Sequence, residues 1–118
     1  MPDRSATVSV KLDKSFPHAP PGWTPDVALK TARAENLTPG EAHWEVVRAL
    51  QEYFARHTED PMIHQRELHD ALEERFHHKG GMRYLYSIFP RGPVAQGCRL
   101  AGLQAPAGSV DKGFGSVV

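Results

Sequence analysis

Cys98 is the one side chain of this sequence that could act as a strong nucleophile, and it is the only cysteine among the 118 residues. A cysteine reacts as its thiolate, so its reactivity depends on whether its surroundings lower or raise its pKa. Arg91 and Arg99 lie close to it in the sequence, which would favour a reactive thiol. Val94 and Ala101 share its face of a predicted helix, which would favour a buried and inert thiol. The chemistry that the sequence predicts is thiol chemistry, with both environments left open.

The other residue types that carry chemistry are not spaced for it. The seven histidines include no pair four residues apart on one predicted helix, and no cysteine or carboxylate stands at a known ligand spacing, so we expect no metal site. The sequence has no glycine-rich phosphate loop, no G-x-S-x-G motif and no pair of catalytic carboxylates, so we expect no cofactor. A single cysteine also cannot form an intramolecular disulfide. Hydrolase and nucleotide-binding functions are therefore not favoured.

The composition is that of one small globular domain. Hydrophobic residues make up 40% and charged residues 24% of the chain, which is typical of a folded protein of this size. No apolar run approaches the ~20 residues that a membrane helix needs. The first ten residues lack the apolar core of a signal peptide. We therefore expect a cytoplasmic protein without a membrane partner.

The net charge of zero conceals an asymmetry along the chain. Residues 1–74 hold 8 Lys and Arg against 13 Asp and Glu, whereas residues 75–118 hold 6 against 1. Such a split can steer association with an acidic protein surface or with nucleic acid, although a solvated surface explains it equally well.

Helix signals recur along the sequence. Thr24 followed by Pro25 predicts an N-cap with proline in the first turn, and Thr38 with Glu41 predicts a capping box. Apolar periodicity predicts five helices, at about residues 25–36, 39–56, 65–76, 82–89 and 93–101. Gly80 and Gly81 are expected to end the third helix, and Gly102 the fifth. The positions expected to be buried are Val27, Leu29, Ala32, Trp44, Val47, Leu50, Phe54, Leu68, Leu72, Phe76, Leu85, Ile88 and Phe89.

The segments outside these helices differ in character. Thr7–Leu12 alternates in polarity and predicts one strand of a short hairpin. The proline-rich residues 17–25 form a linker, in which Trp23 is expected to pack onto the core. We therefore expect three parts: an N-terminal hairpin and linker (1–21), a helical domain (22–103) and a mobile C-terminal arm (104–118).

Two segments together resemble the DsrC/TusE sulfur-relay family. These are AHWEVVRALQEYF (Ala42–Phe54) and RYLYSIFPRGPVAQGCRLAGL (Arg83–Leu103), and the similarity extends over about residues 22–110. The resemblance implies a mainly α fold, a small orthogonal bundle of about five helices with a short N-terminal β-hairpin and a flexible C-terminal arm. It also implies a sulfur carrier that presents its arm to protein partners in sulfur transfer or in a dissimilatory sulfite reductase-like complex. The partner-docking residues that it implies are Arg83, Arg91, Arg99, Gly102 and Leu103.

The arm departs from the family pattern at its reactive end. Cys98 matches the family's upstream cysteine, but Ser109 stands eleven positions later, where the family has its terminal cysteine. Serine forms neither a persulfide nor a disulfide. Gln104 replaces a proline of the family pattern, and residues 111–118 extend the arm. We therefore predict an atypical sulfur carrier with Cys98 as the sulfur acceptor, or an accessory partner of sulfur-transfer proteins.

Two alternatives from other classes stay open. One is a non-catalytic regulatory or interaction module of sulfur metabolism, which Ser109 and the extension suggest. The other is DNA binding through a helix-turn-helix-like pair, because the short segment HHKGG joins two predicted helices and Arg83, Arg91 and Arg99 follow it. The near-neutral charge of the chain argues against DNA binding.

Overall fold

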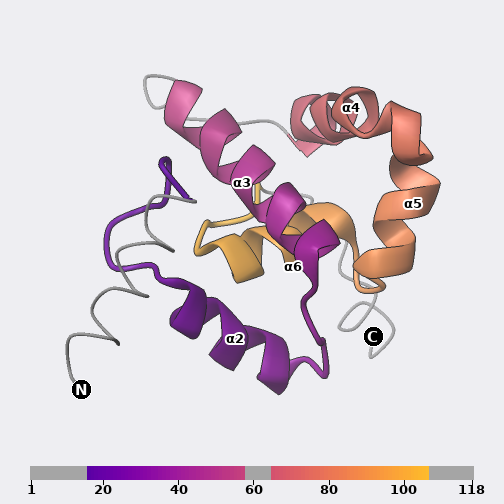
Figure 1. Ribbon diagram of the computed structural model, residues 1–118. Coiled ribbons are helices and arrows are strands. Elements are labelled where there is room, and N and C mark those ends of the chain that lie inside the picture. The colour runs from indigo at the N-terminus through magenta and orange to yellow at the C-terminus, as the bar shows by residue number, and fades with distance from the viewer. Residues whose placement is uncertain (1–15, 58–64, 107–118) are drawn as a thin grey trace, which may run out of the picture.

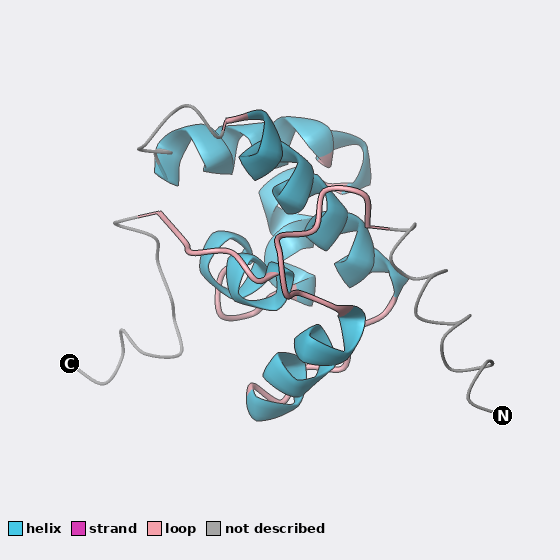
Figure 2. Cartoon of the chain, turned by 90° about the vertical axis from the view of Figure 1, so that its left-hand side faces the viewer, coloured by secondary structure: helices cyan, strands magenta, loops and turns pink. Residues whose placement is uncertain are grey.

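The computed structural model describes residues 16–57 and 65–106, and every regular element in these ranges is helical, as the cartoon in Figure 2 shows. Five α-helices and one short 3₁₀ helix, η1, follow one another along the chain (Figure 1). They are α2 (Pro25–Ala34), α3 (Glu41–Arg56), α4 (Gln65–Arg75), η1 (His77–Lys79), α5 (Gly81–Ile88) and α6 (Pro93–Ala101). The expectation of a mainly helical fold with five helices is confirmed for this part of the chain.

The N-terminal hairpin with Thr7–Leu12, and residues 107–118 of the arm, lie outside the described residues. The division into residues 1–21, 22–103 and 104–118 stays a prediction.

The start of α2 agrees with its sequence signal, and the start of α3 does not. Thr24 caps α2, because its side-chain oxygen accepts a hydrogen bond from the backbone N–H of Val27 at 3.2 Å. In α3 the residue before the first turn is Gly40, so the capping box expected at Thr38 is wrong. The side chain that reaches back is His43, whose Nδ1 accepts from the Gly40 N–H at 2.9 Å.

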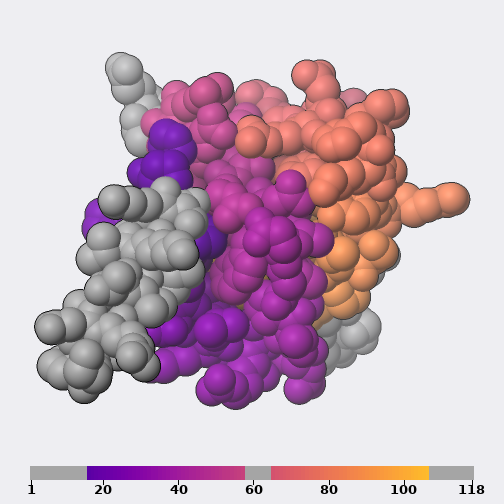
Figure 3. Space-filling model, in the orientation of Figure 1, coloured from indigo at the N-terminus to yellow at the C-terminus, as the bar shows by residue number. Residues whose placement is uncertain are grey.

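Helix α6 is the centre of the fold. It contacts α2, α3, α4 and α5, and Arg99 is its only residue that is not buried. In Figure 1, α6 passes behind α3, and the space-filling view in Figure 3 shows that α3 and the α4–α5 region cover much of that face. Gly97 allows the close approach of α3, since a Cβ there would lie 2.9 Å from the Leu50 side chain. The helix that carries Cys98 is thus a core element.

Most of the expected core positions are buried, and α2 is the exception. Val27 and Leu29 are 43% and 38% exposed, so the expectation that they are buried is wrong. The face of α2 that packs inward instead carries Ala28 and Ala32, which are four residues apart and both fully buried. Small side chains let α2 lie close to α6, which it contacts. The residues confirmed as buried are Trp23, Ala32, Val47, Leu50, Leu68, Leu72, Phe76, Leu85 and Phe89, while Trp44, Phe54 and Ile88 are partly buried.

The connection between α4 and α5 is tighter than the sequence predicts. Helix α4 ends at Arg75, η1 follows, and Gly81 begins α5, so the expectation that Gly80 and Gly81 end the preceding helix is wrong. Gly81 has a φ of +63°, and a Cβ there would lie 2.1 Å from a carboxylate oxygen of Glu73. That carboxylate accepts a hydrogen bond from the Met82 N–H at 2.8 Å. Glu73 therefore satisfies a backbone donor in the first turn of α5.

Candidate functional site

Cys98 lies on α6 with its side chain fully buried. Burial raises the pKa of the Cys98 thiol to about 12, although the charge of Arg99 acts in the opposite direction. A thiol with such a pKa is protonated at neutral pH and is a poor nucleophile. Of the two environments that the sequence left open, this conformation has the buried one. The role of Cys98 as a sulfur acceptor stays a prediction.

The guanidinium group of Arg99 is engaged by a carboxylate at the end of α2. Its Nε lies 2.7 Å and its Nη2 2.9 Å from the two oxygens of Glu35, a bidentate arrangement. Arg91 adds an ion pair with Glu35 at 3.4 Å, and Gln96 donates a hydrogen bond to it at 3.1 Å. The hydrogen bond from Arg99 holds the pKa of Glu35 below its ordinary value. We call Glu35, Arg91, Gln96 and Arg99 the Glu35 cluster.

The Glu35 cluster fixes the turn before α6 as well as α6 itself. The side-chain oxygen of Gln96 accepts from the Arg91 N–H at 3.1 Å, while its amide nitrogen donates to Glu35. Glu35 and Arg99 are 64 positions apart, so no local pattern could have identified the carboxylate that binds both arginines. Sequence reasoning found the arginines and missed Glu35.

The carboxyl end of α6 has all four of its last carbonyl groups hydrogen-bonded. The Leu103 N–H donates to Cys98 O at 2.8 Å, and the Gly102 N–H donates to Arg99 O at 3.3 Å. Gly102 has the left-handed conformation expected of a helix end, with a φ of +77°. The other two donors are side chains from distant parts of the chain: Trp23 Nε1 to Leu100 O at 2.8 Å and Gln51 Nε2 to Ala101 O at 3.0 Å. The point at which the arm leaves the domain is therefore held from outside the helix.

The structure describes all five residues that are expected to dock a partner. Arg91 and Arg99 meet at Glu35, whereas Arg83 is exposed on α5. Gly102 lies under the indole ring of Trp23, and Leu103 packs partly against the core. Ser109 lies outside the described residues. Their role in docking stays a prediction.

This placement also bears on the DNA-binding alternative. Helices α4 and α5 are joined by η1 as a helix pair. Two of the three arginines that suggested phosphate contacts, Arg91 and Arg99, instead bind Glu35. DNA binding by this pair is not favoured.

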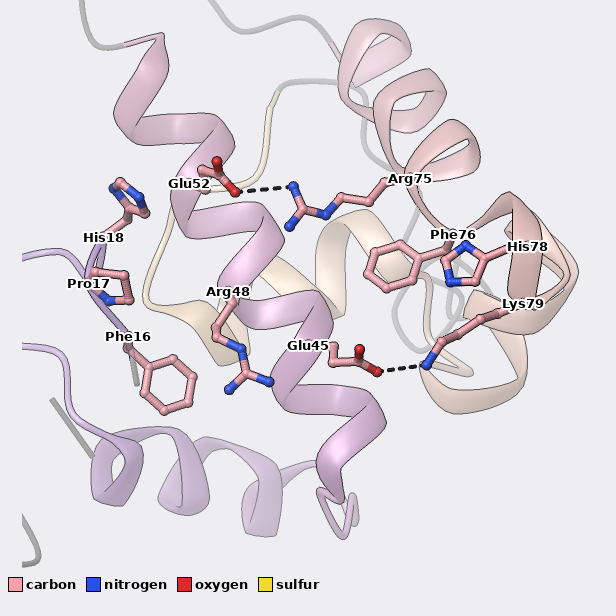
Figure 4. Close-up of a pocket in the computed structure, with 10 residues that line it drawn as sticks. All are labelled: Phe16, Pro17, His18, Glu45, Arg48, Glu52, Arg75, Phe76, His78 and Lys79. Carbon is pink, nitrogen blue, oxygen red and sulfur yellow. Dashed lines mark hydrogen bonds and ion pairs between the residues drawn. The ribbon is translucent and has the colours of Figure 1, made fainter. Parts of the chain in front are cut away.

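A pocket of about 340 Å³ lies between α3 and the α4–η1 junction (Figure 4). Ion pairs bridge its two walls: Glu52 to Arg75 at 3.1 Å and Glu45 to Lys79 at 2.9 Å. The hydrogen bond from Lys79 lowers the pKa of Glu45, and that from Arg75 lowers the pKa of Glu52. Arg75 of α4 and Lys79 of η1 are therefore each paired with a carboxylate of α3. The pocket is lined by Phe16, Pro17, His18, Glu45, Arg48, Glu52, Arg75, Phe76, His78 and Lys79.

Within residues 16–57 and 65–106, no group of three or more His, Cys, Asp or Glu side chains is arranged to hold a metal ion. Among the helices of the same part, none combines the length and the apolar character that crossing a membrane requires.

Comparisons with known proteins agree on one family. The family model described as "DsrC like protein" matches residues 5–110. Sulfurtransferase TusE of Photorhabdus laumondii is 39% identical over 85 residues, which cover 71% of this chain and 75% of that protein. Sulfurtransferase TusE of Escherichia coli K12 is 36% identical over 85 residues, with 71% and 76% coverage. The NMR structure of Allochromatium vinosum DsrC matches at 39% identity and a TM-score of 0.59, covering 75% of this chain and 78% of that one. The resemblance read from the sequence is confirmed, and the chain belongs to the DsrC-like family.

Proposed function

We propose that this protein is a sulfur-trafficking protein that works with protein partners, as an atypical sulfur carrier or as an accessory partner of sulfur-transfer proteins. The observation that carries the proposal is the match of residues 5–110 to the DsrC-like family model, together with relatives named sulfurtransferase. The reactions involved need reduced thiols, which the cytoplasm maintains. We therefore place the protein in the cytoplasm.

As a carrier, the protein uses Cys98. Its thiolate attacks the outer sulfur of a donor persulfide, the donor S–S bond breaks, and the donor leaves as a thiol, so that Cys–SH and R–S–SH give Cys–S–SH and R–SH. The buried thiol with its raised pKa does not undergo this reaction in the conformation described here. Sulfur uptake at Cys98 therefore requires a partner that exposes this part of α6.

The arm is the surface that we propose for docking. Arg83 is exposed on α5, and Gly102 and Leu103 connect the end of α6 to the arm. A sulfite reductase-like complex or a sulfur-transfer protein would be the partner. Because Ser109 carries no thiol, the arm binds the partner but does not carry sulfur.

Intact-mass spectrometry tests the proposal. The reduced protein is incubated with a persulfidated sulfurtransferase, beside the variants Cys98→Ser and Ser109→Cys. We expect Ser109→Cys to gain sulfur, because it restores a thiol at the family's terminal position. A gain on the unmodified chain that Cys98→Ser abolishes supports the carrier role, whereas binding to the sulfurtransferase without a gain supports the accessory role. If neither the unmodified chain nor Ser109→Cys binds the donor or gains sulfur, the proposal is wrong.

A further inference from the structure

The end of α6 depends on two side chains that are remote in the sequence. The backbone can satisfy only two of the last four carbonyl groups, through the N–H groups of Gly102 and Leu103. Leu100 O and Ala101 O are left without a backbone donor by this turn, and Trp23 and Gln51 supply the missing bonds from positions 77 and 50 residues away. Both bonds are buried. Water therefore competes little for these two hydrogen bonds, so the loss of either one costs stability.

Trp23 acts on the same turn in a second way. Its ring lies over Gly102, where a Cβ would be 2.5 Å from a ring carbon. Its position is in turn fixed by Phe16, with ring centroids 4.9 Å apart in an edge arrangement. The indole of Trp23 thus contacts both the carbonyl of Leu100 and Gly102, the residue with the left-handed conformation.

Gln51 is an unusual choice for its position. It is 1% exposed and lies on the buried side of α3, next to Leu50. Its amide nitrogen bonds to Ala101 O, but its Oε1 has no hydrogen-bond partner among the described residues. A buried acceptor without a partner costs stability. Stability alone therefore explains the glutamine poorly, whereas a need to hold Ala101 O explains it.

We propose that Trp23 and Gln51 are positioning residues for the arm: together they fix the last turn of α6 and so the direction in which residues 103–106 leave the domain. Leu103 and Ala105, which follow this turn, pack partly against the core. The use of this direction in partner docking rests on the proposed function. The positioning itself is a property of the isolated chain and is tested there.

Amide hydrogen exchange of the full chain, read by NMR, tests the role of Trp23. We expect Trp23→Phe to reduce the protection of the Gly102 and Leu103 amides about tenfold beyond any change in global stability, since it removes one buried hydrogen bond. Trp44→Phe is the matched control. Trp44 also contacts Phe16 in an edge arrangement, with ring centroids 5.8 Å apart, but no described hydrogen bond joins it to α6. Equal losses in the two variants would overturn the proposal for Trp23.

Two variants of Gln51 separate positioning from stability. Gln51→Leu removes the donor to Ala101 O and also the unpartnered Oε1, so we expect a small change in global stability and about a tenfold loss of protection at Gly102 and Leu103. Gln51→Glu should recover protection when mildly acidic pH protonates the new carboxyl group and restores a donor. Leu68→Ala, which weakens the core at α4, controls for general loosening. Unchanged protection in Gln51→Leu, or a pH response of Gln51→Glu no different from that of the unmodified chain, would overturn the proposal for Gln51.

Discussion

Replacing Glu35 with glutamine should destabilise the fold by about 2–3 kcal/mol at pH 7. The side chain of Glu35 is 11% exposed, and its partners Arg99 and Arg91 are 30% and 22% exposed. Removing one member of a fully buried ion pair costs about 3–5 kcal/mol, whereas an exposed pair contributes about 0–1 kcal/mol. The value lies between these limits because Arg99, once released, can still reach water. With a urea slope of about 1–2 kcal/mol/M, the unfolding midpoint should fall by about 1–3 M.

Urea unfolding followed by tryptophan fluorescence and circular dichroism measures this change. Glu41→Gln is the matched control: Glu41 also pairs with an arginine, Arg48, but its side chain is 74% exposed. The control should change the free energy of unfolding by less than about 0.5 kcal/mol. If Glu35→Gln has an effect as small as that of Glu41→Gln, the Glu35 cluster is a surface feature and the reasoning is refuted.

The stability difference between the unmodified chain and Glu35→Gln should depend on pH in a defined direction. The hydrogen bond from Arg99 lowers the pKa of Glu35 in the folded protein below the ordinary value of 4.5. A lowered folded-state pKa contributes stability that is present above pH 4.5 and is lost as the pH falls through the folded-state pKa. The stability difference between the unmodified chain and Glu35→Gln should therefore shrink below about pH 4.5. A difference that stays constant down to pH 3 would contradict this.

The remaining predictions concern three positions. Cys98 should resist alkylation at pH 7–8 in the folded protein and react fully in urea, because burial raises the pKa of its thiol to about 12; a rate in the folded state near that of a free thiol would be inconsistent with this. Gly102→Ala should cost about 1–3 kcal/mol in urea unfolding, since φ is +77° and an indole ring occupies the space of the new Cβ. His43→Ala should cost about 1–3 kcal/mol, because the ring accepts from the Gly40 N–H and donates to Ile88 O at 2.9 Å; a loss below 0.5 kcal/mol would show that solvent replaces both bonds.

The sequence predicts an element well where its signals are local. Helix α6 has the bounds that Pro93 and Gly102 predict, because proline suits the first turn and glycine the left-handed end. The stripe of Leu68, Leu72 and Phe76 is buried as its spacing predicts. For α2 the expected buried face is wrong. Its most hydrophobic residues, Val27 and Leu29, are exposed, because the small side chains Ala28 and Ala32 form the interface.

The contacts that form the candidate site could not be predicted from the sequence, for a physical reason. The groups that determine it come from distant positions: Glu35 binds Arg99, and Trp23 and Gln51 bind carbonyl groups at the end of α6. The start of α3 is similar, since His43 is held through Ile88 O as well as Gly40. Contacts over such separations leave no periodic pattern in one sequence. The family resemblance, in contrast, needed only two continuous segments.

The central place of α6 has a consequence for the order in which the protein can fold during synthesis. The helix on which α2, α3, α4 and α5 all pack is the last helix of the described chain to leave the ribosome. Until Pro93–Ala101 has emerged, the earlier helices lack the surface that buries their apolar sides. Most of the chain therefore remains incompletely folded until then. A nascent chain arrested before Pro93 should therefore remain sensitive to protease, and one released beyond Leu103 should become resistant.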